Sequence, residues 1–134
     1  MVLHFNLTEK ITMLVLETDK PQVEKIVRAF AEELVKKLDD QIDEIIWYGS
    51  TARGDAEEGS DIDVAVICQH DDSAVEDRIW SIAHEISLEH NALIDARVIS
   101  HECFYGEWGR LSYLAEDIQN EGIVIWKKNG VLIA

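Results

Sequence analysis

Proline, glycine and cysteine are scarce in this chain. Its 134 residues include one proline, seven glycines and two cysteines, Cys68 and Cys103. Without a Pro-rich or Gly-rich linker, the sequence indicates one domain that spans residues 1–134. The two cysteines fit no metal-ligand spacing, so we expect both to remain reduced, with Cys68 at the end of a buried strand.

Long apolar runs are also lacking. No run in the sequence approaches the roughly 18–20 apolar residues that span a bilayer. The N-terminus has none of the features of a signal peptide, which are a basic region, an apolar segment and a small-residue cleavage site. We therefore expect a cytoplasmic protein that does not contact a membrane.

Basic residues are few. Twelve Lys and Arg stand against 27 Asp and Glu, which gives a formal net charge of −15. Binding a nucleic-acid backbone needs clustered Lys and Arg that displace counterions, so the composition argues against direct nucleic-acid binding and favours a basic protein partner. An acidic surface that only keeps the protein soluble, or that suits a salt-rich or hot habitat, explains the charge about equally well.

What the chain does contain is a polar stretch between two strand-like runs. The first run, residues 45–48, ends at Gly49-Ser50, and the second begins at Asp61-Ile62-Asp63. Because side chains alternate along a strand, Asp61 and Asp63 project from the same side. Two adjacent carboxylates repel each other, which raises at least one pKa unless a cation lies between them. Oxygen ligands favour Mg²⁺ or Mn²⁺ over zinc.

A third carboxylate and a phosphate-binding segment complete the candidate site. Asp95 interrupts an otherwise apolar run, so Asp61, Asp63 and Asp95 on adjacent strands are candidate ligands of two metal ions that hold a nucleoside triphosphate. Asp95 is the candidate general base. Gly49 allows the backbone to approach phosphates, the Ser50 hydroxyl can donate to a phosphate oxygen, and the N–H groups of the following helical turn favour an anion.

Each of these residues also has a structural interpretation. An Asp-x-Asp pair at the start of a strand is more often a cap or solvated, Ser50 alone is a helix cap, and Arg53 alone is a surface charge or an ion-pair partner of an aspartate. Asp95 is less easily explained, because burying an unpaired charge is costly. The combination of Gly-Ser at a strand end with Asp-x-Asp ten residues later favours the chemical interpretation.

The N-terminal part of the chain predicts helices. Apolar residues recur at helical spacing over residues 21–38, with Pro21 in the first turn, where its missing N–H costs nothing. Residues 1–17 fit a short helix capped by Thr8, which we favour, although residues 11–16 alternatively fit an edge strand.

Three core strands are expected at residues 44–48, 61–68 and 92–99, the first two of them neighbours in the sheet. Residues 123–126 and 131–133 flank Asn129-Gly130, and this pair predicts a C-terminal hairpin.

Two further helices are expected between these strands. Ser73 and Glu76 have the spacing of a capping box at the start of one helix. The second helix is expected from about residue 109 to residue 120 and to end at Gly122. The expected inward-facing residues are Val75, Ile79, Ile82, Ala83 and Ile86 in the first helix and Leu111, Leu114, Ala115 and Ile118 in the second.

The signature loop resembles that of a known superfamily. Gly49-Ser50, Ala52-Arg53-Gly54 and Ser60-Asp61-Ile62-Asp63-Val64 are similar to the signature of nucleotidyltransferases with the polymerase-beta-like fold, above all their minimal members, the MNT proteins usually paired with a HEPN-domain protein. The resemblance covers residues 21–126, including the ending Glu121–Trp126. We expect residues 1–20 to be an N-terminal extension and residues 127–134 to form a C-terminal hairpin strand.

The resemblance implies an α/β (α+β) fold with a mixed β-sheet packed against helices. It also implies Mg²⁺-dependent transfer of a nucleotidyl group from a nucleoside triphosphate, with release of pyrophosphate. By position, Asp61 and Asp63 are metal ligands and Asp95 is the third carboxylate. Gly49, Ser50 and Arg53 bind or position the triphosphate.

Members paired with HEPN toxins act as antitoxins, and some transfer AMP to a tyrosine of the toxin. We therefore expect transfer of AMP from ATP, with two Mg²⁺ ions, to a hydroxyl of a HEPN-type RNase toxin. One alternative is a transferase that modifies a small molecule such as an aminoglycoside, and another is an antitoxin that neutralises by binding alone. The sequence leaves open whether the chain forms a homo-oligomer or a hetero-oligomer with the toxin.

Two other residue groups have simpler explanations. His84, His90, His101 and Cys103 suit zinc by composition, but the six-residue spacing of His84 and His90 is poor on a helix, which favours solvated or capping histidines. Trp80, Trp108 and Trp126 form either a partner-binding face or, more commonly, buried anchors.

Overall fold

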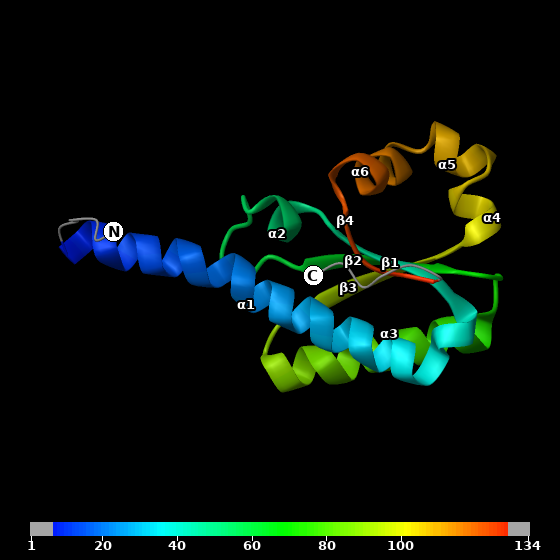
Figure 1. Ribbon diagram of the computed structural model, residues 1–134, viewed down its shortest axis with the longest axis horizontal. Coiled ribbons are helices and arrows are strands. Elements are labelled where there is room, and N and C mark those ends of the chain that lie inside the picture. Colours follow the sequence, from blue (N-terminus) through cyan, green and yellow to red (C-terminus); the bar gives the residue numbers. More distant parts are fainter. Residues whose placement is uncertain (1–6, 129–134) are drawn as a thin grey trace.

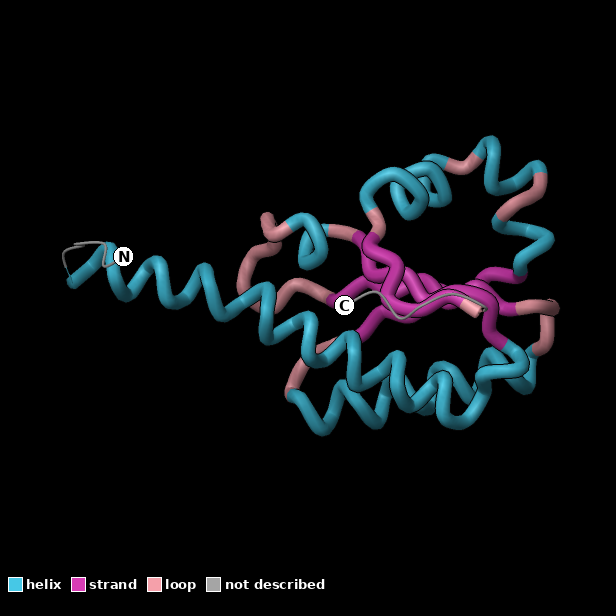
Figure 2. Tube along the Cα trace, viewed as in Figure 1, coloured by secondary structure: helices cyan, strands magenta, loops and turns pink. Residues whose placement is uncertain are grey.

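Helical segments separate the described strands along the chain, one each between the first and second strands and between the second and third, and three between the third and fourth (Figures 1 and 2). This computed structural model describes the backbone of residues 7–128 and the side chains of residues 20–128. The elements are α1 (Leu7–Leu38), the 3₁₀ helix η1 (Asp39–Gln41), β1 (Ile42–Tyr48), α2 (Ser50–Arg53), β2 (Ile62–Cys68), α3 (Ser73–His90), β3 (Ile94–Ser100), α4 (His101–Phe104), α5 (Glu107–Leu111), α6 (Tyr113–Glu121) and β4 (Ile123–Lys127).

The described strands form one mixed sheet in the order β3-β2-β1-β4. β1 is antiparallel to β2 and to β4, whereas β2 and β3 are parallel because α3 crosses over between them. The expected strands and the expected pairing of the first two are therefore confirmed. In this register Tyr48 lies opposite Asp63, and Asp63 lies opposite Asp95.

The two faces of the sheet are covered by different helices (Figure 1). α1 and α3 pack on one face, where the buried side chains of β2 are Ile62, Val64, Val66 and Cys68. α4 and α6 pack on the other face against Ala65 and Ile67. Cys68 is 2% exposed at the end of its strand, as expected.

The first helix differs from its predicted start. α1 runs without a break from Leu7, so Thr8 lies inside its first turn and Pro21 lies in its interior. The predictions of a start at Pro21 and of a cap at Thr8 are wrong. A proline inside a helix loses one hydrogen bond at a cost of about 3 kcal/mol, and the helix-forming residues on both sides carry the helix through it.

The helical region before β4 is interrupted, whereas one continuous helix was predicted. The expected helix over residues 109–120 is two helices, because Ser112 leaves helical geometry and its hydroxyl accepts the Ala115 N–H at 3.3 Å. Leu111 is consequently 75% exposed, and the prediction that it faces inward is wrong. Ala115 and Ile118 are buried as predicted.

The remaining differences are small. α3 is capped by Asp72, whose carboxylate accepts the Ala74 N–H at 2.9 Å, so the capping box predicted at Ser73 is wrong by one residue. Val75 is half-buried, whereas the rest of its predicted stripe is buried. The hairpin strand at residues 131–133 lies outside the described residues. No helix among the described residues has the length and apolar content needed to span a membrane.

Candidate active site

The three predicted carboxylates lie together on the face of the sheet that also carries α4–α6. Asp63 of β2 and Asp95 of β3 are direct neighbours in the parallel register, so their side chains leave the same face. Asp61 immediately precedes β2 and is exposed. The structure therefore places Asp63 and Asp95 side by side on adjacent strands, as predicted, and Asp61 lies at the start of β2 where its charge acts on Asp63.

Asp63 is the centre of this group. Its pKa is raised, first by partial burial and then by the charges of Asp95 and Asp61, while Arg97 and Arg53 oppose the shift. A carboxyl group surrounded in this way resists ionisation unless a cation approaches it.

Gly49 makes room for that carboxylate. A Cβ atom on Gly49 would overlap the Asp63 carboxylate oxygen and would lie 3.1 Å from Asp63 Cγ. Gly49 also has a φ of +81°, a conformation that other residues rarely adopt. The sequence suggested that this glycine admits a phosphate. The structure adds a second reason for glycine here, which is the close approach of Asp63.

The loop that carries Gly49, Ser50 and Arg53 is anchored to β1. The indole N–H of Trp47, which is fully buried, donates to the Thr51 hydroxyl at 2.9 Å. Ser50 is the first residue of α2 and its side chain does not cap the helix, so the structural interpretation of Ser50 is wrong. The loop is held in place, therefore, without using the Ser50 hydroxyl for capping.

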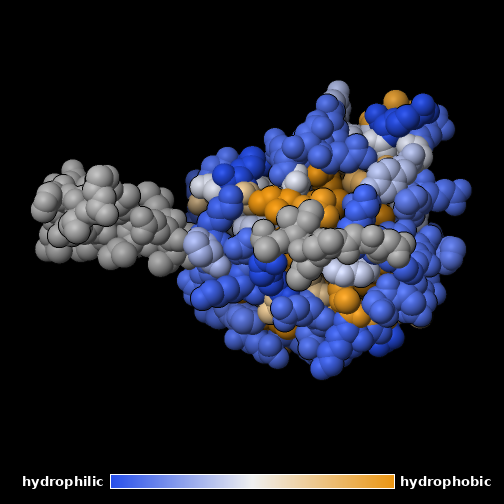
Figure 3. Space-filling model, in the orientation of Figure 1, coloured by the Kyte–Doolittle hydropathy of each residue, from blue (hydrophilic) through white to orange (hydrophobic). Residues whose placement is uncertain are grey.

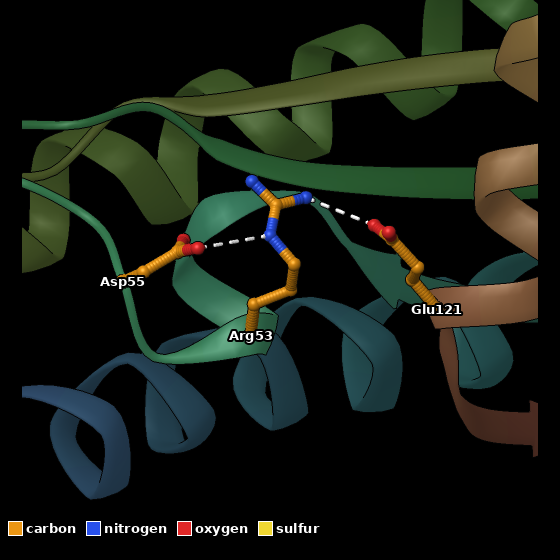
Figure 4. Close-up of polar contacts among 3 residues, drawn as sticks. All are labelled: Arg53, Asp55 and Glu121. Carbon is orange, nitrogen blue, oxygen red and sulfur yellow. Dashed lines mark hydrogen bonds and ion pairs between the residues drawn. The ribbon is translucent and has the colours of Figure 1, made fainter.

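Arg53 lies between two carboxylates (Figure 4). Its Nε donates to Asp55 at 3.2 Å and its Nη1 to Glu121 at 2.9 Å. These two hydrogen bonds raise the pKa of the guanidinium further, first that to Asp55 and then that to Glu121. The ion-pair interpretation of Arg53 is thus correct in the structure, and Glu121 is a partner that the sequence analysis did not identify.

Two further residues of the site were missed. Arg97 follows Asp95 by two positions and therefore shares its face, a signal that the strand period already contained. Tyr48 lies opposite Asp63, and its pKa is raised to about 12 by burial and by the nearby carboxylates, with Arg97 acting in the opposite direction. Tyr48 could not be placed from the sequence because its contact depends on the β1–β2 register.

A surface hollow lies farther along β3 than this group. Its volume is about 310 Å³, and Arg97 forms part of its wall together with Ser100, Cys103 and Trp108. None of the three carboxylates lines this hollow, which shares only Arg97 with the residues around Asp63.

The carboxylates suit a hard cation by their chemistry. They offer only oxygen donors, and their mutual repulsion would fall if a cation lay between them. Within the described side chains, no three His, Cys, Asp or Glu residues are already closed around one point. The residues considered for zinc are not gathered either, and His101 pairs instead with Asp43 at 3.0 Å.

Comparison with known families places the chain clearly. A family model described as "Nucleotidyltransferase domain" matches residues 27–125. A protein of Methanocaldococcus jannaschii named "Putative protein adenylyltransferase" is 28% identical over 105 residues, which are 78% of this chain and 99% of the relative. A second protein of the same organism and description is 36% identical over 81 residues, 60% of this chain and 77% of the relative.

Solved structures share the fold. A structure from Sulfolobus solfataricus, described as a "putative nucleotidyltransferase", aligns with a TM-score of 0.55 at 17% identity, covering 88% of this chain and 92% of that one. A toxin–antitoxin structure, MntA-HpeT, aligns with a TM-score of 0.51 at 16% identity, covering 75% of this chain and 73% of that one. Identities this low show the fold alone, and they confirm the expected mixed-sheet architecture.

Proposed function

The chain belongs to the nucleotidyltransferase-domain family, and we propose that it transfers AMP from ATP to a hydroxyl group of a partner protein in the cytoplasm. The observation that carries this proposal is the adjacency of Asp63 and Asp95 on parallel strands, with Asp61 beside them. Three carboxylates on one face, next to a loop with the family signature, are what a nucleotidyl transfer requires.

In this proposal Asp61, Asp63 and Asp95 hold two Mg²⁺ ions, for which Mn²⁺ can substitute. When bound, the metal neutralises charge on the phosphates and polarises the α-phosphorus for attack. Asp95 takes the proton of the acceptor hydroxyl, which then forms a new O–P bond to the α-phosphorus. The bond between the α- and β-phosphates breaks, and pyrophosphate leaves with the electron pair.

Gly49, Ser50 and Arg53 receive the triphosphate in the same proposal. The Ser50 hydroxyl does not cap α2, so it can donate a hydrogen bond to a phosphate oxygen. Arg53 brings a guanidinium, whose planar set of N–H groups matches phosphate oxygens. Its position near the carboxylates is supported by its effect on the pKa of Asp63.

The proposed acceptor is a HEPN-type RNase toxin, which the protein neutralises as an antitoxin. The relatives named as protein adenylyltransferases and the fold shared with a toxin–antitoxin structure support this partner. A net charge of −15 suits a basic protein. On the face of the molecule drawn in Figure 3, most of the described residues are hydrophilic.

A cluster of exposed hydrophobic side chains also supports a protein acceptor over a small molecule. Tyr105, Trp108, Leu111 and Tyr113 are all more than 40% exposed on the α4–α6 segment, which packs on the same face of the sheet as Asp63. Trp80 is 49% exposed as well, so the interpretation of Trp80 and Trp108 as buried anchors is wrong. Exposed apolar clusters of this kind are typical of protein–protein contacts.

The experiment that tests the proposal is transfer of label from [α-³²P]ATP, in the presence of Mg²⁺, to the HEPN-type toxin proposed as the partner. We expect label on the partner with the wild-type protein and with Asp77→Asn, which removes the same charge from exposed α3. We expect at least about a 10²-fold loss with Asp61→Asn.

Two outcomes would contradict the proposal. Inhibition of the partner without label, unaffected by Asp61→Asn, would show neutralisation by contact alone. Label on a small hydroxylated acceptor but never on the protein would show the small-molecule activity instead.

A further inference from the structure

The ion pairs of Arg53 join two parts of the chain that are far apart in sequence. We define the Arg53 bracket as Arg53 at the end of α2, Asp55 in the loop that follows, and Glu121 at the end of α6, 68 positions from Arg53 (Figure 4). Asp55 accepts from Nε, and Glu121 accepts from Nη1. Nη2 takes part in neither bond, and Figure 4 shows it pointing away from both carboxylates.

Backbone contacts hold the segments that carry Arg53 and Glu121 in place. On one side, the Arg53 N–H donates to the Gly49 carbonyl at 3.0 Å, and Gly49 packs directly against Asp63. On the other side, Gly122 ends α6 so close to β1 that an added Cβ would overlap the Ile46 side chain and the Ile118 carbonyl. Glu121 therefore projects from a junction that packing holds against the sheet.

The bracket contributes little to folding stability. The side chains of Arg53 and Glu121 are 43% and 41% exposed, and exposed ion pairs are heavily screened by water. Their geometry is more informative than their strength, because two acceptors at different nitrogens fix the plane of a guanidinium that would otherwise sample many rotamers.

We propose that Glu121 is a positioning residue for nucleotide binding: together with Asp55 it orients Arg53 so that Nη2 faces the phosphates of the bound nucleotide. This inference rests on the proposed function, and it assigns a role to a residue outside the signature loop. The orientation is set before the nucleotide arrives, so the free energy of ordering a long side chain is not lost on binding.

The test is a comparison of Glu121→Ala, Glu121→Gln and Glu116→Ala in the full chain. Glu116 is exposed on the same helix, and its removal changes the net charge equally. With Mg²⁺ present, we expect Glu121→Ala to raise the Kd for ATP and the KM by about 3- to 10-fold, with kcat nearly unchanged. Glu121→Gln keeps an oxygen that accepts from Nη1 and should restore most of the affinity.

A second background makes the result specific to Arg53. In Arg53→Ala, the further change Glu121→Ala should have no additional effect on the Kd, because the residue that it positions is gone. All variants should melt within a few degrees of the wild type, since the bracket is exposed.

Three results would overturn the positioning role alone. The first is tighter ATP binding by Glu121→Ala, which would make Glu121 a competitor of the phosphates. The second is an equal rise in the Kd for ATP when Glu121→Ala is made in the Arg53→Ala background. The third is a loss of ATP affinity in Glu121→Ala no greater than that in Glu116→Ala. A wild-type protein that binds ATP but transfers no label leaves this test intact and overturns the proposed function. A wild-type protein that binds no ATP overturns both.

Discussion

The two faces of β2 differ although their residues alternate along the same seven positions. Ile62, Val64 and Val66 are at most 2% exposed beneath α1 and α3. Asp63, between them, points to the opposite face, where it is surrounded by Asp61, Asp95 and Arg97 and where its pKa is raised. One face is therefore apolar along the whole strand, whereas the other buries Ala65 and Ile67 farther along but at Asp63 holds charges that oppose stability.

This difference indicates how the fold supports a reactive site. The apolar face supplies rigidity, so the charged face can keep carboxylates beside one another despite their repulsion. Substitutions on neighbouring residues should consequently have opposite consequences. A change at Ile62 should lower stability and spare chemistry, and a change at Asp63 should do the reverse.

The largest effect is expected for Asp63→Asn. Label transfer should fall at least about 10²-fold, while Tm should rise by about 1–4 °C at neutral pH. The folded protein holds the pKa of Asp63 above its usual value. The contribution of this group to folding stability therefore falls as the pH rises from the usual pKa of aspartate to the raised pKa of the folded protein. The gain in Tm should therefore disappear at low pH, where aspartate is neutral in both states. An unchanged or lower Tm at neutral pH would contradict this account.

Ile62→Ala should show the opposite profile on the adjacent residue. Truncating a side chain that is 2% exposed leaves a cavity and should cost about 2–5 kcal/mol of the free energy of unfolding, measured by denaturation with urea. The fraction that remains folded should keep its kcat. A loss of kcat comparable to that of Asp63→Asn would mean that the two faces are not separate in function.

Gly49→Ala links the backbone to the charged face, and Gly59→Ala is its matched control. Both glycines have a φ near +80°, but an added Cβ at Gly59 meets no atom within 4 Å, whereas at Gly49 it overlaps Asp63. Both substitutions should cost about 1–2 kcal/mol of stability through the strained φ.

Activity should separate the two variants. Gly49→Ala should lose at least about 10-fold in label transfer because Asp63 is displaced, and Gly59→Ala should remain close to the wild type. Equal losses would show that backbone strain, rather than the position of Asp63, accounts for the requirement.

The smallest effect is expected for Arg97→Gln. Arg97 opposes the rise in the pKa of Asp63, so its removal should raise that pKa further and move the acidic limb of the pH–activity profile to higher pH. Arg110→Gln, on exposed α5, removes the same charge at a distance and should leave the profile unchanged. An acidic limb that moves equally in both variants would indicate a general charge effect.

Much of the fold was predictable because local patterns determine it. Alternation along residues 61–68 correctly placed Asp61 and Asp63 together, and an aspartate within an apolar strand correctly indicated a charged neighbour for them. The capping residue Asp72 and the start of α1 were missed because several residues nearby can serve equally well, and packing decides among them.

The parts of the site that the sequence did not predict depend on contacts between distant segments. Glu121 meets Arg53 only because α6 returns the chain to β1, and Tyr48 meets Asp63 only through the strand register. Leu111 was expected inside because helical periodicity assumes an unbroken helix, and Ser112 breaks it. Arg97 is different, since its two-residue spacing from Asp95 was readable in the sequence.

We propose that Asp63 and Asp95, held side by side by two parallel strands, form one cation site. The most direct measurement is the change in Tm when Mg²⁺ and ATP are added to the wild type, Asp63→Asn and Asp95→Asn. Ligands that bind the folded state raise Tm, so we predict a rise for the wild type and none for either variant. An equal rise in all three proteins would contradict the claim.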